Sequence, residues 1–340
     1  MTDTTAIDEN RVALDLMIRA FQVSRMIRLV ADFGIADKIP GDGRCDVREL
    51  ATACAVLPAP LLRILRALAA FEVFRVSADG WVTHSPRSLL LRADAPNSLH
   101  HAARFWATPG SWEAWGALDV ALTGGVPHKA AWNNTRFEYL REHADEARIF
   151  DAFMAHAFDD RHNAIACAYD FSDAALIVDL GGGNGEALRR ILARFQTPRG
   201  LVFDREDVVA AIPPDARSSG RIDVEGGSFF DRVPAGADFY LLVRVLHDWS
   251  DEDCGRILRT CRATMSPKAR LLIAEQILEP DPTIGHATGY LIDIQMMAMF
   301  GSARERTETE FDELLAASGF TSVRLIPTAA SVSIIEAVPN

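Results

Sequence analysis

Short apolar runs alternate with helical stretches in the second half of the chain. From residue 174 onward, five runs rich in β-branched residues occur at ALIVDL, GLVFD, RIDVEG, DFYLLVRVL and ARLLIAE. Strands separated by helices are typical of a doubly wound parallel sheet. Two further runs, TSVRLIP and SVSIIEAV, are separated by a short connection that permits an antiparallel pair but no parallel crossover. The pattern predicts an α/β domain over 171–340, with a mostly parallel sheet that ends in an antiparallel pair.

The first hundred residues follow a different pattern. Between Asn10 and Val30, apolar residues recur at helical spacing, which predicts one long helix with a broad apolar stripe. Two short helices are expected at 47–53 and 60–70, and a hairpin is expected from 74–76 and 81–83. Helix, turn, helix and a two-stranded wing is a winged-helix pattern, so residues 1–100 are predicted to form a mainly α winged-helix domain.

The second short helix of this domain does not suit DNA recognition. It carries only Arg63 and Arg66 and is otherwise apolar, whereas a recognition helix presents polar side chains to base edges. An apolar helix beside an amphipathic one exposes a large hydrophobic patch on a monomer, and such patches mark interfaces. We expect a homodimer; a winged-helix transcriptional regulator is the alternative from another functional class.

Composition changes this picture little. The formal net charge of −12 argues against nucleic acid or an anionic membrane as the main partner. The five cysteines include no C-x-x-C pair, and no cluster of His, Asp and Glu has the spacing of metal ligands, so no metal is expected. The N-terminus lacks the features of a signal peptide and no run of eighteen apolar residues occurs, so we expect a cytoplasmic protein without a membrane segment.

Residues 101–170 are rich in aromatic side chains and are expected to form helices that bridge the two domains. Aromatic stripes usually belong to a core, but bridging helices are also where apolar ligand pockets form. A later helix adds methionines, which adapt to flat apolar ligands. The candidate pocket residues for a flat aromatic acceptor are Trp106, Phe153, Met154, Asp293 and Met297.

A glycine-rich turn follows the first strand of the α/β domain. The segment VDLGGGNG places Gly181, Gly183 and Gly185 between strand and helix, where they permit sharp turns and close approach of a ligand. The dinucleotide pattern G-x-G-x-x-G does not fit. Asp204 ends the second strand, where the topology places a carboxylate for ribose hydroxyls. Together with the antiparallel end of the sheet, this set resembles an S-adenosylmethionine-dependent methyltransferase domain; for Asp179, a role in the loop and a contact with the ligand both remain open.

A histidine and a glutamate mark the same edge of the predicted sheet. His247 follows the fourth strand and Glu275 ends the fifth, so the two side chains are expected to emerge side by side. A carboxylate next to an imidazole holds its tautomer and favours the imidazolium. That arrangement suits a general base that takes a proton from a hydroxyl.

Three motifs extend the resemblance over nearly the whole chain. HDWSD, IAEQIL and GSARERTETEFDELLAASGF are similar to segments of the small-molecule O-methyltransferase family, which includes plant caffeic acid-type and bacterial natural-product enzymes. The resemblance implies that His247 is the base, that Glu275 and Glu305 flank it, and that the winged-helix domain forms the homodimer. It also implies S-adenosylmethionine as the cofactor and a small hydroxylated aromatic compound as the acceptor.

Two positions depart from the family pattern. Ser228 stands where the family commonly has an aspartate in G-D-x-F, and Val243 stands where lysine or serine is frequent. Phe229 and Arg244 are expected to compensate in part. The expected cofactor contacts are thus Gly181, Gly183, Asp204, Ser228, Phe229 and Arg244. The departures leave open a methyltransferase fold repurposed for hydroxylation, decarboxylation or cyclisation.

Overall fold

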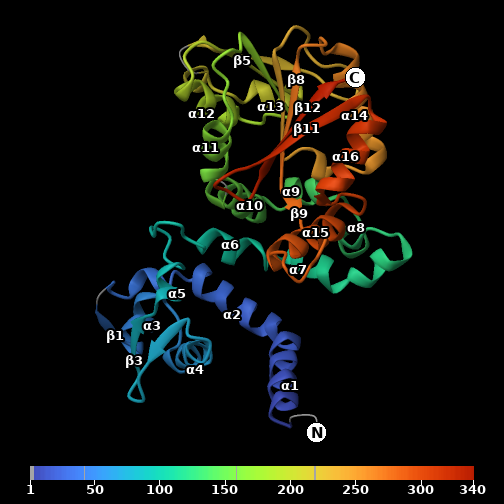
Figure 1. Ribbon diagram of the computed structural model, residues 1–340. Coiled ribbons are helices and arrows are strands. Elements are labelled where there is room, and N and C mark those ends of the chain that lie inside the picture. Colours follow the sequence, from blue (N-terminus) through green and yellow to red (C-terminus); the bar gives the residue numbers. More distant parts are fainter. Residues whose placement is uncertain (1–3, 42, 158, 218–219) are drawn as a thin grey trace. The chain divides into compact units, whose positions relative to one another are not determined.

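The structure is a computed structural model that describes residues 4–41, 43–157, 159–217 and 220–340 (Figure 1). The chain forms two compact units. The first contains residues 1–113 and 137–157, and the second contains residues 114–136 and 158–340. The segment 101–170, which we expected to bridge two domains, is divided between these units.

The first unit begins with two helices where one was predicted. Helix α1 spans Thr4–Ile18 and helix α2 spans Ala20–Asp32. At Arg19 the backbone has φ −92° and ψ 0°, outside the helical region, so the second helix starts anew. The prediction of a single helix was wrong because the apolar stripe continues across a break that no proline or glycine marks.

The short helices and the hairpin follow as expected. Helix α3 (Val47–Ala53) and helix α4 (Pro58–Ala69) precede strands β2 (Phe74–Val76) and β3 (Trp81–His84). Strand β1 (Arg44–Asp46), which was not predicted, pairs with β3 and gives a three-stranded sheet in the order β1-β3-β2. Leu61, Leu65 and Leu68 of α4 are buried in the core of this unit, so its apolar face is used for packing.

Short helices complete the first unit. They are η1 (Ala36–Lys38), α5 (Pro86–Leu89), α6 (His100–Phe105), α9 (Arg136–Glu142) and α10 (Ala144–Ala157). The first residue of α9, Arg136, still belongs to the segment 114–136 of the second unit. Helix α7 (Pro109–Gly116) contains the boundary between the units. Within the described ranges, none of the helices combines the length and apolar character needed to cross a membrane alone; α3 and α4 together meet that test but are bent by 111°.

The second unit is built on a seven-stranded sheet. The strands are β4 (Leu176–Leu180), β5 (Arg199–Asp204), β6 (Ile222–Gly226), β7 (Phe239–Val243), β8 (Arg270–Glu275), β11 (Phe320–Pro327) and β12 (Ser333–Pro339). They lie in the order β11-β12-β8-β7-β4-β5-β6. The first five pair in parallel, and β12 is antiparallel to both β8 and β11 (Figure 1). This confirms the predicted parallel sheet with an antiparallel end, which the resemblance to methyltransferase domains also implied.

Alternate strand residues bury opposite faces of this sheet. Val178 and Leu242 pack with residues of α14 (Asp251–Thr264) and α16 (Glu308–Ala317). Their neighbours Ile177 and Leu241 pack with residues of α11 (Asp159–Ala168) and α12 (Glu186–Arg194). Because side chains of a strand alternate between faces, a continuous apolar run is what two covered faces require.

The remaining elements lie around the sheet. They are η2 (Leu118–Thr123), α8 (Pro127–Trp132), α13 (Glu206–Ala210), η3 (Pro214–Ala216), η5 (Leu246–Asp248), α15 (Ala287–Phe300) and the two-residue strands β9 (Ile277–Leu278) and β10 (Arg306–Thr307). Ser250 caps α14: its hydroxyl accepts the N–H of Asp253 at 3.1 Å, and acids fill the first turn.

Candidate active site

The carboxyl ends of the five parallel strands bring the polar candidates to one edge of the sheet. Asp204 pairs in register with Gly226, and Val243 pairs with Ala274, so the segments that follow β5, β6, β7 and β8 begin at matching levels. The glycine turn follows β4 at the same edge. Open α/β sheets bind their ligands at this position.

The glycine turn at residues 181–185 forms a concave backbone surface, here called the cradle, that larger side chains would fill. Gly181, Gly183 and Gly185 have φ values of +71°, +55° and +79°, which L residues rarely adopt. A Cβ at Gly182 would lie 2.6 Å from Oδ2 of Asp179, and a Cβ at Gly181 would lie 3.0 Å from Val245. The sequence is therefore glycine-rich here for reasons of both conformation and space.

Asp204 is fixed to this cradle. Its Oδ2 accepts the N–H of Gly183 at 2.9 Å, and its Oδ1 accepts the N–H of Arg205 at 2.7 Å. Each carboxylate oxygen has a second lone pair, so Asp204 can still accept hydrogen bonds from a ribose. The predicted cofactor residues Gly183 and Asp204 are thus brought into direct contact.

Asp179 lies beneath the cradle without a hydrogen-bond partner for either oxygen among the described residues. It is 1% exposed. Burial, and then the nearby charge of Asp204, raise the pKa of Asp179 to about 7. A buried carboxyl group without partners, beside a glycine cradle, fits a ligand that carries positive charge, as the sulfonium and ammonium groups of S-adenosylmethionine do.

Ser228 and Phe229 follow β6. The Ser228 hydroxyl accepts the N–H of Phe230 at 3.2 Å, so its oxygen already serves the local turn. The Phe229 ring lies 3.5 Å from the position that a Cβ at Gly181 would take, and it meets the Trp249 ring edge-on at 6.0 Å. Of these two expected cofactor residues, Phe229 therefore borders the cradle directly.

His247 lies in η5 between two carboxylates. Its Nδ1 is 3.2 Å from Oε2 of Glu275, and its Nε2 is 3.2 Å from Oδ1 of Asp248. Glu275 is completely buried, whereas the Asp248 side chain is 43% exposed. The predicted juxtaposition of His247 and Glu275 is confirmed. Asp248 was missed, although its position directly after the histidine was a signal in the sequence.

Glu275 organises the backbone around His247 as well as its ring. Its Oε1 accepts the N–H groups of Val245 and Leu246, each at 2.9 Å. Burial alone raises the pKa of Glu275, but the adjacent His247 and Arg244 outweigh it and lower the pKa to about 2. Glu275 is therefore ionised at neutral pH and holds the turn and the imidazole together.

Arg244 joins the two expected glutamates. Its Nη1 donates to Glu275 at 2.9 Å and to Glu305 at 2.8 Å, and its Nη2 donates to Glu305 at 2.6 Å. We expected Arg244 at the cofactor and Glu305 beside His247. The structure places Arg244 between the glutamates, because its φ of +55° turns the chain at the end of β7, and Glu305 is linked to His247 only through Arg244 and Glu275.

Sequence reasoning also missed two buried arginines. Arg161 in α11 is buried, and its charge interacts with those of Arg244, Glu275 and Glu305. Burial, with repulsion by Arg244, lowers the pKa of Arg161 to about 10. Arg306, next to Glu305, is 1% exposed. The only signal for Arg306 was its place inside the motif RERT; Arg161 had none.

The candidate acceptor residues form one group in each unit. In the first, the Trp106 and Phe153 rings are 5.3 Å apart and edge-on, Phe153 stacks on Phe105 at 4.3 Å, and Met154 is exposed. In the second, Asp293 and Met297 lie on α15, and Oδ1 of Asp293 accepts the N–H of Glu305 at 2.9 Å. Among the described residues, no group of three His, Cys, Asp or Glu side chains could hold a metal ion.

Comparison with known proteins agrees with this geometry. Residues 115–321 match the O-methyltransferase domain family. The chain is 34% identical over 329 residues to phenazine O-methyltransferase PhzM of Lysobacter antibioticus, an alignment that covers 95% of this chain and 94% of that protein. The structure of the mitomycin 7-O-methyltransferase MmcR superposes with a TM-score of 0.87 at 30% identity, covering 99% of this chain and all of that one.

A third relative shows the family's cofactor and an aromatic ligand. The O-methyltransferase NcsB1 of neocarzinostatin biosynthesis was solved with S-adenosylmethionine and 2-hydroxy-5-methyl naphthoic acid. It matches with a TM-score of 0.79 at 28% identity, over 94% of this chain and 96% of that one. The chain therefore belongs to the O-methyltransferase family and is an S-adenosylmethionine-dependent O-methyltransferase of the bacterial natural-product type.

Proposed function

We propose that His247 is the general base for methylation of a hydroxyl group on a small aromatic natural product. The observation that carries the proposal is the contact of 3.2 Å between Nδ1 of His247 and the buried carboxylate of Glu275. This contact favours the tautomer with the proton on Nδ1. Nε2, which lies 3.2 Å from the partly exposed Asp248 carboxylate, would take the proton of the acceptor hydroxyl once that hydroxyl replaces Asp248 beside the ring. S-Adenosylmethionine supplies the electrophilic methyl group.

The charges around His247 support that step. Glu275, Glu305 and Asp248 contribute three negative charges, and Arg244 and Arg161 contribute two positive charges. The remaining negative charge, held by a Glu275 carboxylate that stays ionised, stabilises the imidazolium that forms when His247 takes the proton. Glu275 thus acts on the histidine directly, and Glu305 acts by keeping Arg244 in place.

The cofactor is assigned to the cradle and its rim. Gly181 and Gly183 allow the ligand to approach the backbone, Asp204 accepts from the ribose, and Phe229 offers an apolar surface. Ser228 and Arg244 remain in this proposed set at its edge. The unpartnered carboxyl of Asp179 supports a positively charged ligand at this place.

The proposed acceptor residues are two sets, each described within its own unit: Trp106, Phe153 and Met154 in the first, and Asp293 and Met297 in the second. Flat apolar side chains and adaptable methionines suit a flat ring system. The relatives support an aromatic acceptor, because one is named for a phenazine and another was solved with a naphthoic acid.

The first unit is proposed to be a winged-helix module that pairs with a second copy of the chain. The large apolar residues Val12, Leu14, Leu16, Met17, Ile18 and Phe21 are exposed along α1 and the start of α2. We call this set of exposed apolar side chains the apolar face of α1 and α2; their concentration in one segment marks an interface. The apolar side of α4 packs into its own core, and its exposed side carries only Arg63 and Arg66 as charged residues. This argues against a transcriptional regulator, whose recognition helix presents several polar side chains to the bases.

Two measurements test the function together. Calorimetric titration with S-adenosylhomocysteine is expected to show micromolar binding. Incubation with S-adenosylmethionine labelled in its methyl group and a panel of hydroxylated phenazines, quinones and naphthoic acids is expected to give labelled product. Binding of the cofactor with conversion of an acceptor into an unlabelled product would instead establish the repurposed chemistry of hydroxylation, decarboxylation or cyclisation.

A further inference from the structure

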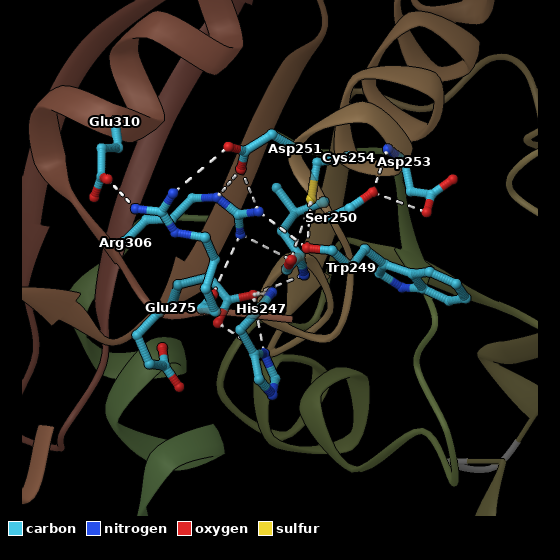
Figure 2. A network of polar contacts seen from close by, with 12 residues as sticks. His247, Trp249, Ser250, Asp251, Asp253, Cys254, Glu275, Arg306 and Glu310 are labelled. Carbon is cyan, nitrogen blue, oxygen red and sulfur yellow. Dashed lines mark hydrogen bonds and ion pairs between the residues drawn. The ribbon is translucent and has the colours of Figure 1, made fainter. Parts of the chain in front are cut away.

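We propose that Arg306 is a positioning residue that fixes the turn bearing His247, so that its imidazole faces the acceptor. The inference rests on the proposed function of His247 as the base. Arg306 does not touch the imidazole in the structure. Its contacts go to the backbone on both sides of the histidine and to the start of the next helix (Figure 2).

The guanidinium of Arg306 binds three groups of the segment that carries His247. Nη1 donates to the carbonyl of Leu246 at 3.0 Å, and Nη2 donates to the carbonyl of Trp249 at 3.0 Å. Nε and Nη2 donate to Oδ1 of Asp251 at 2.9 and 2.7 Å. Arg306 therefore binds the turn at three places: at Leu246 just before the histidine, at Trp249 just after the turn, and at Asp251 where α14 begins.

These contacts complement those of Glu275. Glu275 accepts the N–H groups of Val245 and Leu246, whereas Arg306 donates to carbonyls of the same turn. The N–H of Arg304 also donates to the carbonyl of His247 at 3.0 Å. Within the turn, the N–H groups of Asp248 and Trp249 donate to the carbonyls of Val245 and Leu246, each at 3.2 Å. One buried carboxylate and one buried guanidinium add side-chain contacts from outside the turn and fix it to β8 and β10.

The strand that carries Arg306 links both sides of the site. β10 pairs in parallel with β9, with Arg306 opposite Ile277, just beyond Glu275 at the end of β8. Glu305 binds Arg244 ahead of the turn, and Arg306 binds the turn itself. The successive residues Glu305 and Arg306 thus connect the β10 segment to two places near the histidine: Arg244 before the turn and the backbone of the turn.

The energetic contribution of Arg306 comes from the carbonyls more than from its ion pair. The Asp251 side chain is 60% exposed, so water screens that pair. The Arg306 side chain is 1% exposed, and only a guanidinium offers a planar fork with enough donors to reach two carbonyls and a carboxylate at once. A lysine at this position lacks that geometry, which makes the Arg306→Lys variant informative.

The test compares Arg306→Gln and Arg306→Lys with the control Arg199→Gln. Arg199 lies at the start of β5, at the edge of the sheet opposite the site, is 54% exposed, and pairs with the side chain of Asp223. We expect both Arg306 variants to lower kcat by about 10- to 100-fold. The KM for the acceptor and the affinity for S-adenosylhomocysteine should change by less than about twofold, and the control should resemble the parent protein in every measurement.

A second readout does not depend on transfer. The His247 ring signal in histidine-detected NMR, assigned by its loss in His247→Gln, should shift and titrate differently in the Arg306 variants and stay unchanged in Arg199→Gln. Failure of the parent protein to methylate any acceptor would count against the proposed function, while the NMR comparison would still decide the role of Arg306.

Three outcomes would overturn the inference. The first is a folded Arg306→Gln protein with the kcat and the His247 titration of the parent. The second is full rescue by Arg306→Lys, which would show that the fork is not needed. The third is a parallel loss of cofactor affinity, thermal stability and activity, which would reveal a general structural role. If Arg306→Gln does not fold, Arg306→Lys alone decides between these results.

Discussion

Arg244 grips both carboxylate oxygens of Glu305, with N–O distances of 2.8 and 2.6 Å, and shares one of its nitrogens with Glu275. Both glutamates are fully buried, and the arginine side chain is nearly so. The family resemblance implies that Glu275 and Glu305 flank the histidine. The structure shows that Arg244, which was expected at the cofactor, neutralises part of their negative charge. This arrangement makes Arg244 a structural requirement of the catalytic edge.

Replacing Arg244 should destabilise the protein strongly. Arg244→Gln leaves two buried carboxylates with one cation fewer, and removal of one partner from a buried ion pair costs about 3–5 kcal/mol. Arg199→Gln is the matched control, since the pair of Arg199 with Asp223 is exposed and should contribute less than about 1 kcal/mol. Urea denaturation of the two variants measures both values. Equal losses of stability would contradict the central role given to Arg244.

The sheet was predictable from the sequence, and the direction of Arg244 was not. Each buried strand shows itself as a continuous apolar run because both faces are covered. The order of the strands then brings His247 and Glu275 to adjacent positions. By contrast, the left-handed backbone at Arg244 depends on tertiary contacts, and nothing in its own sequence marks it.

Very short elements escaped prediction for a related reason. Strands β1, β9 and β10 have two or three residues each, too few for an alternation of apolar and polar positions. β10 nevertheless carries Arg306 and follows directly on Glu305. Part of the candidate site thus lies on an element that exists only because neighbouring strands and buried charges hold it.

Removing the imidazole should separate turnover from cofactor binding. His247→Asn is expected to lower kcat by at least about 10²-fold, since general-base assistance typically contributes that much. The affinity for S-adenosylhomocysteine should stay within about twofold of the parent. Radiolabel transfer and calorimetry measure the two quantities. His286→Gln, an exposed position at the start of α15, is the control; unchanged turnover in His247→Asn would remove His247 from the mechanism.

Protonation of Asp179 should make stability depend on pH. Its pKa in the folded protein is about 7, above the ordinary value of 3.8, because burial and Asp204 disfavour the charge. A raised pKa gives stability that is complete below about pH 4 and is lost as the pH rises through about 7. Asp179→Asn should therefore gain stability relative to the parent as the pH rises from 5 to 8, with most of the gain complete by about pH 7.

The measurement is the difference in Tm between Asp179→Asn and the parent, taken in the absence of cofactor from pH 5 to pH 8. Other titrating groups are common to both proteins and cancel in this difference. A gap between the two Tm values that stays constant over the range would show that Asp179 is ionised throughout. That result would also remove the basis for a neutral carboxyl beneath the glycine cradle.

The variant Gly182→Ala, which adds a methyl group to the cradle, should bind the cofactor more weakly. A Cβ at Gly182 would lie 2.6 Å from Oδ2 and 2.7 Å from Cγ of Asp179, so the loop must shift. Overpacking of this kind costs about 1–3 kcal/mol, and we expect at least about tenfold weaker binding of S-adenosylhomocysteine by calorimetry. Gly116→Ala is the control because a Cβ there meets nothing within 4 Å. Equal affinities in the two variants would place the cofactor elsewhere.

Charges on the exposed apolar face of α1 and α2 should abolish the proposed pairing of two chains. Met17 and Phe21 are 71% and 56% exposed and belong to the apolar face defined above. Replacing both with glutamate forces charges into any apolar contact between copies, which is costly without a partner of opposite sign. Light scattering at micromolar concentration is expected to give the mass of a dimer for the parent and of a monomer for the double variant.

Leu122→Glu is the control, since Leu122 is 87% exposed but lies in η2, in the other unit. A parent protein that is already monomeric, or a double variant that remains dimeric, would exclude this face as the interface.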